Sequence, residues 1–238
     1  MMKNKIVWLP LILIALLFVG ACDSPVTPAP QTKSATATVQ VVQVIEGEIS
    51  LDRNFYLIVD DSDSMASNDY AGSFPKRIEA AKWALEEFVT KAVPSDVNLG
   101  LYALNSGKEL VPLGKNRDLI IAKIRQLNNR NGTPLNEAVR DGTNALVKQR
   151  DKQLGYGEFY LVVATDGEAT DGDMRNSVAY ATKNKIPIIT IGFGIKDHPL
   201  KNQSLSYREA TSPQELLQAL KETQGESDYF DTNTFKKQ

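Results

Sequence analysis

Three runs of predominantly apolar residues constrain this chain more than any other feature. They cover residues 55–59, 159–164 and 186–193, and none of them alternates strictly between apolar and polar side chains. Runs of this kind are typical of strands covered on both faces, as in a parallel sheet with helices on each side. The segment 97–103 does alternate, which favours a strand nearer to an edge of the sheet, paired with residues 109–111.

Helical patterns lie between the predicted strands and after the last of them. Apolar residues recur at three- and four-residue spacing, Pro134 suits a first helical turn, and Ser212 suits an N-cap. Strands that alternate with helices predict an α/β fold, in which a doubly wound, mostly parallel central sheet is flanked by helices on both faces. The expected helices cover residues 75–92, 116–127, 134–149, 173–184 and 213–222.

The N-terminal segment predicts export. A basic start with Lys3 and Lys5 is followed by an apolar run over residues 6–19, which is the pattern of a secretory signal and is short for a membrane span. The next residues, Gly20-Ala21-Cys22, complete a tetrapeptide that resembles the lipobox of bacterial lipoproteins. This resemblance implies cleavage before Cys22 and lipidation of its thiol, and several acyl chains anchor a protein stably. The alternative is a buried N-terminal helix or an uncleaved anchor.

The remaining sequence predicts the domain organisation and the location. The residues after Cys22 are rich in Pro, Thr, Ser and Ala, which is typical of a flexible tether. We expect the domain on the extracytoplasmic side of the bacterial cell envelope, and Asp23 resembles a signal for inner-membrane retention. A possible edge strand covers residues 39–45. The predicted signal peptide, tether, lead-in, domain and tail cover residues 1–21, 22–38, 39–53, 54–223 and 224–238.

Composition argues against several classes of function. The chain has 27 Lys and Arg against 29 Asp and Glu, a formal net charge of −2, so we expect no nucleic-acid partner. One cysteine and one histidine exclude an intramolecular disulfide and nearly every histidine-based zinc or catalytic site. The G-x-S-x-G motif of serine hydrolases is absent from the sequence. We therefore expect a protein that is not an enzyme, with His198 as a surface loop residue.

Hydroxyl and carboxyl side chains follow the predicted strands where each strand ends. In open α/β sheets, ligands bind beyond the carboxyl ends of the strands, at the point where the strand order reverses. Three loops therefore form the candidate site. Glu168, which lies in one of these loops, is a candidate for the rim of the site. The loops contain Asp60-Asp61-Ser62-Asp63-Ser64, Asn131-Gly132-Thr133-Pro134 and Thr165-Asp166-Gly167-Glu168.

Together these loops resemble the metal-ion-dependent adhesion site of the von Willebrand factor type A (vWA) domain. The family pattern is D-x-S-x-S after the first strand, a Thr in a second loop, and an Asp that opens a D-G turn after the central strand. The resemblance covers residues 54–222 and implies the doubly wound vWA fold. It also implies a metal site formed by Asp60, Ser62, Ser64, Thr133 and Asp166.

The residue types in these loops suit a hard divalent cation. Mg²⁺ prefers six oxygen ligands at about 2.0–2.1 Å, and three hydroxyls with two carboxylates supply oxygens; Mn²⁺ and Ca²⁺ are alternatives. In the family, hydroxyls commonly bind the metal directly and carboxylates often act through water. The resemblance therefore implies an electrophilic metal that accepts an Asp or Glu carboxylate of a protein partner. The alternative is a hydroxyl-rich turn that only caps the first helix.

Two acidic residues depart from the family pattern. Asp63 stands between the two serines, where the family often has glycine, and Asp61 precedes Ser62. Their charge would deepen the negative potential, and so favour Ca²⁺ or Mn²⁺ alongside Mg²⁺ or weaken the capture of an acidic partner. We expect instead that both side chains point to solvent. Asp61, Asp63 and Tyr70 join Glu168 as candidates for the rim of the site.

Two alternatives come from other classes of protein. Asp61-Ser62-Asp63-Ser64 after an apolar strand also resembles the first motif of haloacid dehalogenase-type phosphatases, in which the first Asp is the nucleophile and the second a general acid beside Mg²⁺. That interpretation leaves the Gly132-Thr133 loop unexplained. The other alternative is a structural or assembly component of an envelope complex, in which the metal site is ancillary.

Overall fold

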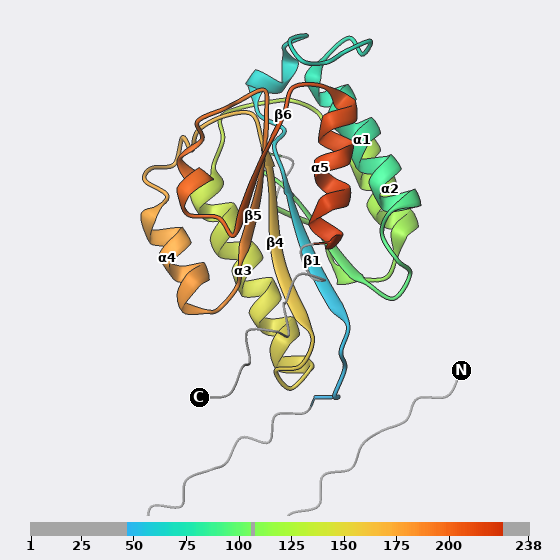
Figure 1. Cartoon of the computed structure of the whole chain (residues 1–238), viewed down its shortest axis with the longest axis vertical. Coiled ribbons are helices and arrows are strands. Elements are labelled where there is room, and N and C mark those ends of the chain that lie inside the picture. The colour runs from blue at the N-terminus through green and yellow to red at the C-terminus, as the bar shows by residue number, and fades with distance from the viewer. Residues whose placement is uncertain (1–46, 106–107, 226–238) are drawn as a thin grey trace, which may run out of the picture. The chain divides into compact units, whose positions relative to one another are not determined.

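The computed structural model describes residues 47–105 and 108–225. Within these residues, six strands form one sheet in the order β3-β2-β1-β4-β5-β6 (Figure 1). All neighbouring strands are parallel except β2 and β3, which are antiparallel. The doubly wound, mostly parallel α/β fold is therefore confirmed. The strands are β1 (Arg53–Val59), β2 (Asn98–Ala103), β3 (Lys108–Gly114), β4 (Glu158–Thr165), β5 (Ile188–Phe193) and β6 (Ser206–Ala210).

All five predicted helices are present, with bounds that differ from the expected ones by a few residues. Ser212 is confirmed as an N-cap, because its Oγ accepts a hydrogen bond of 3.2 Å from the backbone N of Glu215. Two short 3₁₀ helices, η1 (Asp63–Ala66) and η2 (Pro199–Asn202), lie in loops and were not expected. The α-helices are α1 (Arg77–Lys91), α2 (Arg117–Gln126), α3 (Leu135–Lys152), α4 (Arg175–Lys183) and α5 (Pro213–Gly225).

The helices cover both faces of the sheet. Figure 1 shows α1, α2 and α5 on one face and α3 and α4 on the other. In β1, Phe55 and Leu57 are buried in the first of these layers, whereas Tyr56 and Ile58 are buried in the second. Successive side chains of a strand point to opposite faces, so both sets must be apolar. This explains why residues 55–59 of β1 form an uninterrupted apolar run.

The strand order reverses between β1 and β4, and this places two loops side by side. The two strands are parallel and in register to their ends, where Val59 is paired with Ala164. The backbone N of Asp60 donates a hydrogen bond of 2.9 Å to the Ala164 carbonyl. The loop after β1 and the loop after β4 therefore begin next to each other, at the position where such sheets bind ligands.

Several predictions fall outside the described residues. These are the signal peptide, Cys22, the tether, the possible edge strand over residues 39–45, and the tail beyond Gly225. In the described part of the lead-in, residues 47–52 form no strand, and Arg53 begins β1. Among the helices in the described ranges, none has the length and apolar character needed to cross a membrane.

Candidate metal centre

Asp60 ties the loop after β1 to the loop after β4. Its side chain is buried, and Oδ1 accepts a hydrogen bond of 2.9 Å from the backbone N of Ser62. Its Oδ2 accepts from Thr165 Oγ1 at 2.6 Å and from the backbone N of Asp166 at 3.4 Å. Both carboxylate oxygens are thus held by donors without formal charge. The carboxylate is therefore fixed at the carboxyl ends of the two adjacent strands.

The two serines continue from Asp60 to the second carboxylate. Ser62 Oγ and Ser64 Oγ are 2.8 Å apart, and Ser64 Oγ donates a hydrogen bond of 2.7 Å to Asp166 Oδ1. Two ligands in adjacent positions of an octahedral Mg²⁺ site, each at about 2.0–2.1 Å, are about 2.9 Å apart. The spacing of the serine oxygens therefore fits neighbouring positions around such an ion.

Thr133 approaches from a third loop. Its backbone is fixed by Thr170, whose Oγ1 accepts from Thr133 N at 2.8 Å and whose N donates to Thr133 O at 2.9 Å. A Cβ placed on Gly167 would lie 3.6 Å from Thr133 Oγ1 and 3.9 Å from Ser64 Oγ. The two hydroxyls thus lie within contact distance of the same point beside Gly167.

The structure places a positively charged side chain at the site that the sequence analysis did not predict. Arg77, the first residue of α1, is 7% exposed, and its Nη1 forms an ion pair with Asp166 Oδ2. Its Nε donates a hydrogen bond of 3.2 Å to the Asp69 carbonyl, and its Cζ lies 5.4 Å from the centre of the Tyr70 ring. The Phe193 ring centre is 5.9 Å from the same atom. The guanidinium is therefore held by an acid, a carbonyl and two aromatic rings.

The charges around Asp166 act in opposite directions on its carboxyl group. Burial raises the pKa of Asp166, and the neighbouring Asp60 carboxylate raises it further. The hydrogen bond from Ser64 and the charge of Arg77 lower it. Burial and the second acid are the larger effects, so the pKa of Asp166 lies above its ordinary value. A carboxyl group of this kind is stabilised in its ionised form by an added cation.

His198 is not the surface loop residue that the sequence suggested. It is 2% exposed, its Nδ1 accepts from Leu200 N at 3.1 Å, and its Nε2 lies 2.8 Å from the Gly167 carbonyl oxygen. Because Nδ1 is an acceptor, Nε2 carries the proton and donates to Gly167. Burial lowers the pKa of His198, although the Gly167 carbonyl raises it. The neutral His198 therefore stabilises the turn after β4 through its hydrogen bond to the Gly167 carbonyl.

The expectation that Asp61 points to solvent is wrong, whereas the one for Asp63 is confirmed. Asp61 is 0% exposed, and its Oδ1 accepts from the backbone N of Asn105 at 2.7 Å, so it fixes the segment after β2. Asp63 and Glu168 are exposed. Tyr70 is 44% exposed and packs on Arg77, and this contact connects Tyr70 to the site. Asp61 is therefore part of the support of the loop, whereas Asp60 and Asp166 are the acids that hydrogen bonds join to the serines.

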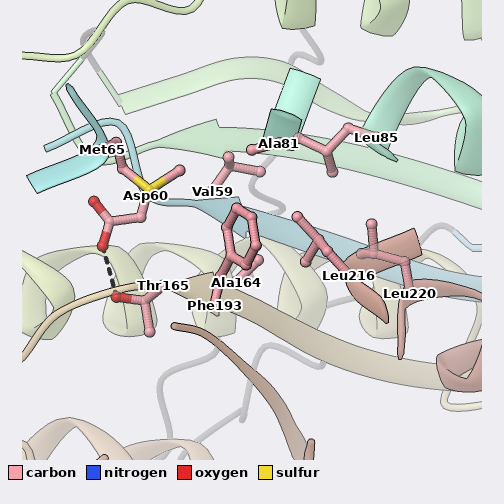
Figure 2. Close-up of a pocket in the computed structure, with 10 residues that line it drawn as sticks. All are labelled: Val59, Asp60, Met65, Ala81, Leu85, Ala164, Thr165, Phe193, Leu216 and Leu220. Atoms are coloured by element: carbon pink, nitrogen blue, oxygen red, sulfur yellow. Dashed lines mark hydrogen bonds between the residues drawn. The ribbon is translucent and has the colours of Figure 1, made fainter. Parts of the chain in front are cut away.

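A small cavity of about 10 Å³ lies beneath the site, on the side of α1 and α5. Figure 2 shows the hydrogen bond between Asp60 and Thr165 at one end of this cavity and the apolar side chains of Phe193 and Leu216 farther along it. The polar groups of the site therefore stand directly above the apolar core. The apolar core beneath the polar groups lowers the local dielectric constant, and this strengthens the interactions between charges at the site.

The donor set fits a divalent cation held largely by hydroxyl oxygens. Asp60, Ser62, Ser64 and Asp166 are joined by hydrogen bonds, and Thr133 faces the same space. Within residues 47–105 and 108–225, no three Asp, Glu, His or Cys side chains gather into a group that could hold a metal ion. A metal here would thus depend on the serine and threonine oxygens as well as on the two acids.

The comparisons with known proteins agree with this architecture. Residues 55–168, which contain all five candidate ligands, match the family model of the von Willebrand factor type A domain. No curated protein sequence matches the chain.

Solved structures show the same fold at low sequence identity. The SpRpn10 vWA domain is 18% identical, with a TM-score of 0.58, and the match covers 71% of this chain and 93% of that one. The vWF domain of the type V pili tip protein Mfa5 from Porphyromonas gingivalis is 13% identical, with a TM-score of 0.55 and coverages of 76% and 96%. The manganese-loaded TRAP protein of Plasmodium vivax is 15% identical, with a TM-score of 0.52 and coverages of 71% and 72%. The fold of the described residues is therefore that of vWA domains.

Proposed function

We propose that this vWA-fold domain is a protein-binding or adhesion module that depends on a divalent cation and is anchored by lipid in the bacterial cell envelope. The observation that carries the proposal is the convergence of three hydroxyl side chains and two carboxylates from three loops. These loops meet at the carboxyl ends of β1 and β4, where this fold class binds ligands. The manganese in the structure of the TRAP protein supports a metal role for this fold.

The side chains have distinct roles in this proposal. Ser62, Ser64 and Thr133 would offer neutral oxygens to Mg²⁺, Mn²⁺ or Ca²⁺, while Asp60 and Asp166 would supply negative charge. Both oxygens of Asp166 are already engaged, by Ser64 and by Arg77, which favours an indirect role for this carboxylate. When bound, the cation would supply an open coordination position for an Asp or Glu carboxylate of a protein partner.

The same geometry favours binding over catalysis. The single histidine of the chain is engaged by Gly167 and Leu200, so it is not presented as a base to Ser62 or Ser64. In the phosphatase alternative, Asp61 is the nucleophile, yet Asp61 is buried against the backbone of Asn105. These two observations support a domain that is not an enzyme.

Partner capture in intact cells tests the proposal. We expect a crosslinked partner to be retained by the wild-type chain and lost after chelation or in the Asp60→Ala variant. Asp63→Ala is the matched control, because it removes an exposed acid from the same loop. Retention of the partner under all conditions would contradict metal-dependent binding and favour the structural or assembly role.

The lipid anchor has a separate test, because Cys22 lies outside the described residues. Cys22→Ala should abolish palmitate labelling and leave the precursor uncleaved, since cleavage follows attachment of lipid to the thiol. A labelled Ala variant of mature size would contradict the anchor. One structural neighbour is the vWF domain of a pili tip protein, which is consistent with an envelope location.

A further inference from the structure

Arg77 makes direct contacts with two loops of the candidate metal centre. Its guanidinium pairs with Asp166 Oδ2, and the Asp166 carboxylate is fully buried. Its backbone N donates a hydrogen bond of 2.7 Å to the Ser67 carbonyl, and its Nε donates to the Asp69 carbonyl. Arg77 thus holds the end of the serine loop and the carboxylate of the other loop at the same time.

The position of the guanidinium is fixed from several sides. Tyr70 and Phe193 lie within cation–π distance of it, and Tyr70 itself packs closely against Gly194. A Cβ on Gly194 would lie 2.5 Å from Tyr70 Cδ2, so a larger residue there would displace the ring. Arg77 therefore cannot leave Asp166 without the loss of several contacts.

A fixed positive charge changes the electrostatics of a metal centre. Asp60 and Asp166 supply two negative charges, and Arg77 offsets one of them. A divalent cation on the three hydroxyls would lie close to Asp166 and would be repelled by the guanidinium on the far oxygen of that carboxylate. In a partly buried site this repulsion is weakly screened.

We propose that Arg77 is a resident cation that lowers the affinity of this site for divalent metal ions. The inference rests on the proposed metal centre and identifies the residue that tunes it. With Arg77 in place, the metal-free site is already partly neutralised and ordered. Metal ions therefore fill it only at a higher concentration than the two acids and three hydroxyls alone would require.

Mn²⁺ titration of the full chain in non-ionic detergent, with free Mn²⁺ followed by its EPR signal, tests this role. Arg77→Gln removes the charge but keeps a hydrogen-bond donor for Asp166, and it should bind Mn²⁺ about tenfold more tightly than the wild type. Lys76→Gln is the matched control, because it removes the same charge from an exposed neighbour. Its affinity should stay within about twofold of the wild type.

A second pair of variants keeps the test informative if Arg77→Gln folds poorly because its Asp166 has no cationic partner. Asp166→Asn and the double variant Arg77→Gln/Asp166→Asn differ only in the arginine, and the double variant leaves no unpaired charge from the pair. Removal of Arg77 should strengthen Mn²⁺ binding in this background as well. Circular dichroism of each variant is the check that it is folded.

The outcomes separate this inference from the proposed function. If the wild type binds Mn²⁺ and removal of Arg77 leaves the affinity unchanged or weaker in both backgrounds, Arg77 only positions Asp166 and the inference is wrong. If only variants without Arg77 bind Mn²⁺, the inference is supported in its strongest form. If no variant and no wild-type chain binds Mn²⁺, both the metal centre and the inference are contradicted.

Discussion

The loops after β1 and β4 each begin beside a buried carboxylate, yet the two carboxylates are held by different means. Asp60 accepts hydrogen bonds from Ser62 N, Thr165 Oγ1 and Asp166 N, which carry no formal charge. Asp166 accepts from the Ser64 hydroxyl and from the Arg77 guanidinium. Adjacent strand ends bring two acids together, and a cation from α1 offsets the resulting repulsion at only one of them.

This difference predicts unequal costs for two substitutions in the metal-free protein. Arg77→Gln leaves the buried Asp166 carboxylate beside Asp60 without its counter-ion and should lower the free energy of unfolding by about 3 kcal/mol. Asp60→Asn removes a charge whose partners are neutral donors, and it should cost about 1 kcal/mol. Urea unfolding in the presence of a chelator measures both values. Equal costs would show that the ion pair contributes little to stability.

His198 supports the loop after β4, where its Nε2 donates to the Gly167 carbonyl. Asn at position 198 would retain an N-cap acceptor for Leu200 N but lose the bond to Gly167. Gly167 is half-buried, so water can replace the lost donor, and the loss at pH 7.5 should be about 1 kcal/mol.

The pH dependence of that loss follows from the lowered pKa of His198. The unfolded chain takes up the proton near pH 6.5, before the folded one does, so the contribution of the histidine is present above pH 6.5 and decreases below it. The difference in unfolding free energy between wild type and His198→Asn should therefore shrink between pH 7.5 and 5.5. A difference that grows over this range would contradict the neutral, Nε2-protonated histidine.

Substitution of Thr133 should have the smallest effect on metal binding, because Thr133 supplies one neutral oxygen and lies on a different loop from the two acids. Thr133→Ala removes one neutral oxygen and leaves the backbone bonds with Thr170 in place, so the Mn²⁺ affinity should fall by at most about tenfold, or 1.4 kcal/mol. Retention of a crosslinked partner should fall further, and Thr133→Ser should restore it. Equal losses in both measurements would make Thr133 a plain ligand.

The sequence was sufficient for the fold and for the placement of the three loops. The run over β1 predicts a doubly covered strand because Phe55 and Tyr56 are buried on opposite faces. The loops after β1 and β4 were located because carboxyl ends of parallel strands share one edge of a sheet. The loop with Thr133 lies between α2 and α3, and it was located by the resemblance to the vWA pattern. Asp60 and Asp166 follow adjacent strands, so their proximity depends only on strand order.

The neighbours that set the charge of the site could not be predicted in this way. Arg77 reaches Asp166 because the segment after Ser64 folds back, with Arg77 N bonded to Ser67 O, and no spacing in the sequence indicates that turn. His198 stands between Asp197 and Pro199 in a polar stretch, which is typical of a surface loop. Its burial depends on a contact with Gly167, which is distant in the sequence.

The stoichiometry of Mn²⁺ binding to the full chain, followed by EPR, tests the central claim most directly. The wild type and Asp63→Ala should each bind one Mn²⁺ per chain at this site, whereas Asp60→Ala should lose that binding. Saturation at 100 times the dissociation constant should also stabilise the wild type by about 2.7 kcal/mol. Unchanged Mn²⁺ binding in Asp60→Ala, or its loss in Asp63→Ala, would contradict a metal centre formed by Asp60, Ser62, Ser64, Thr133 and Asp166.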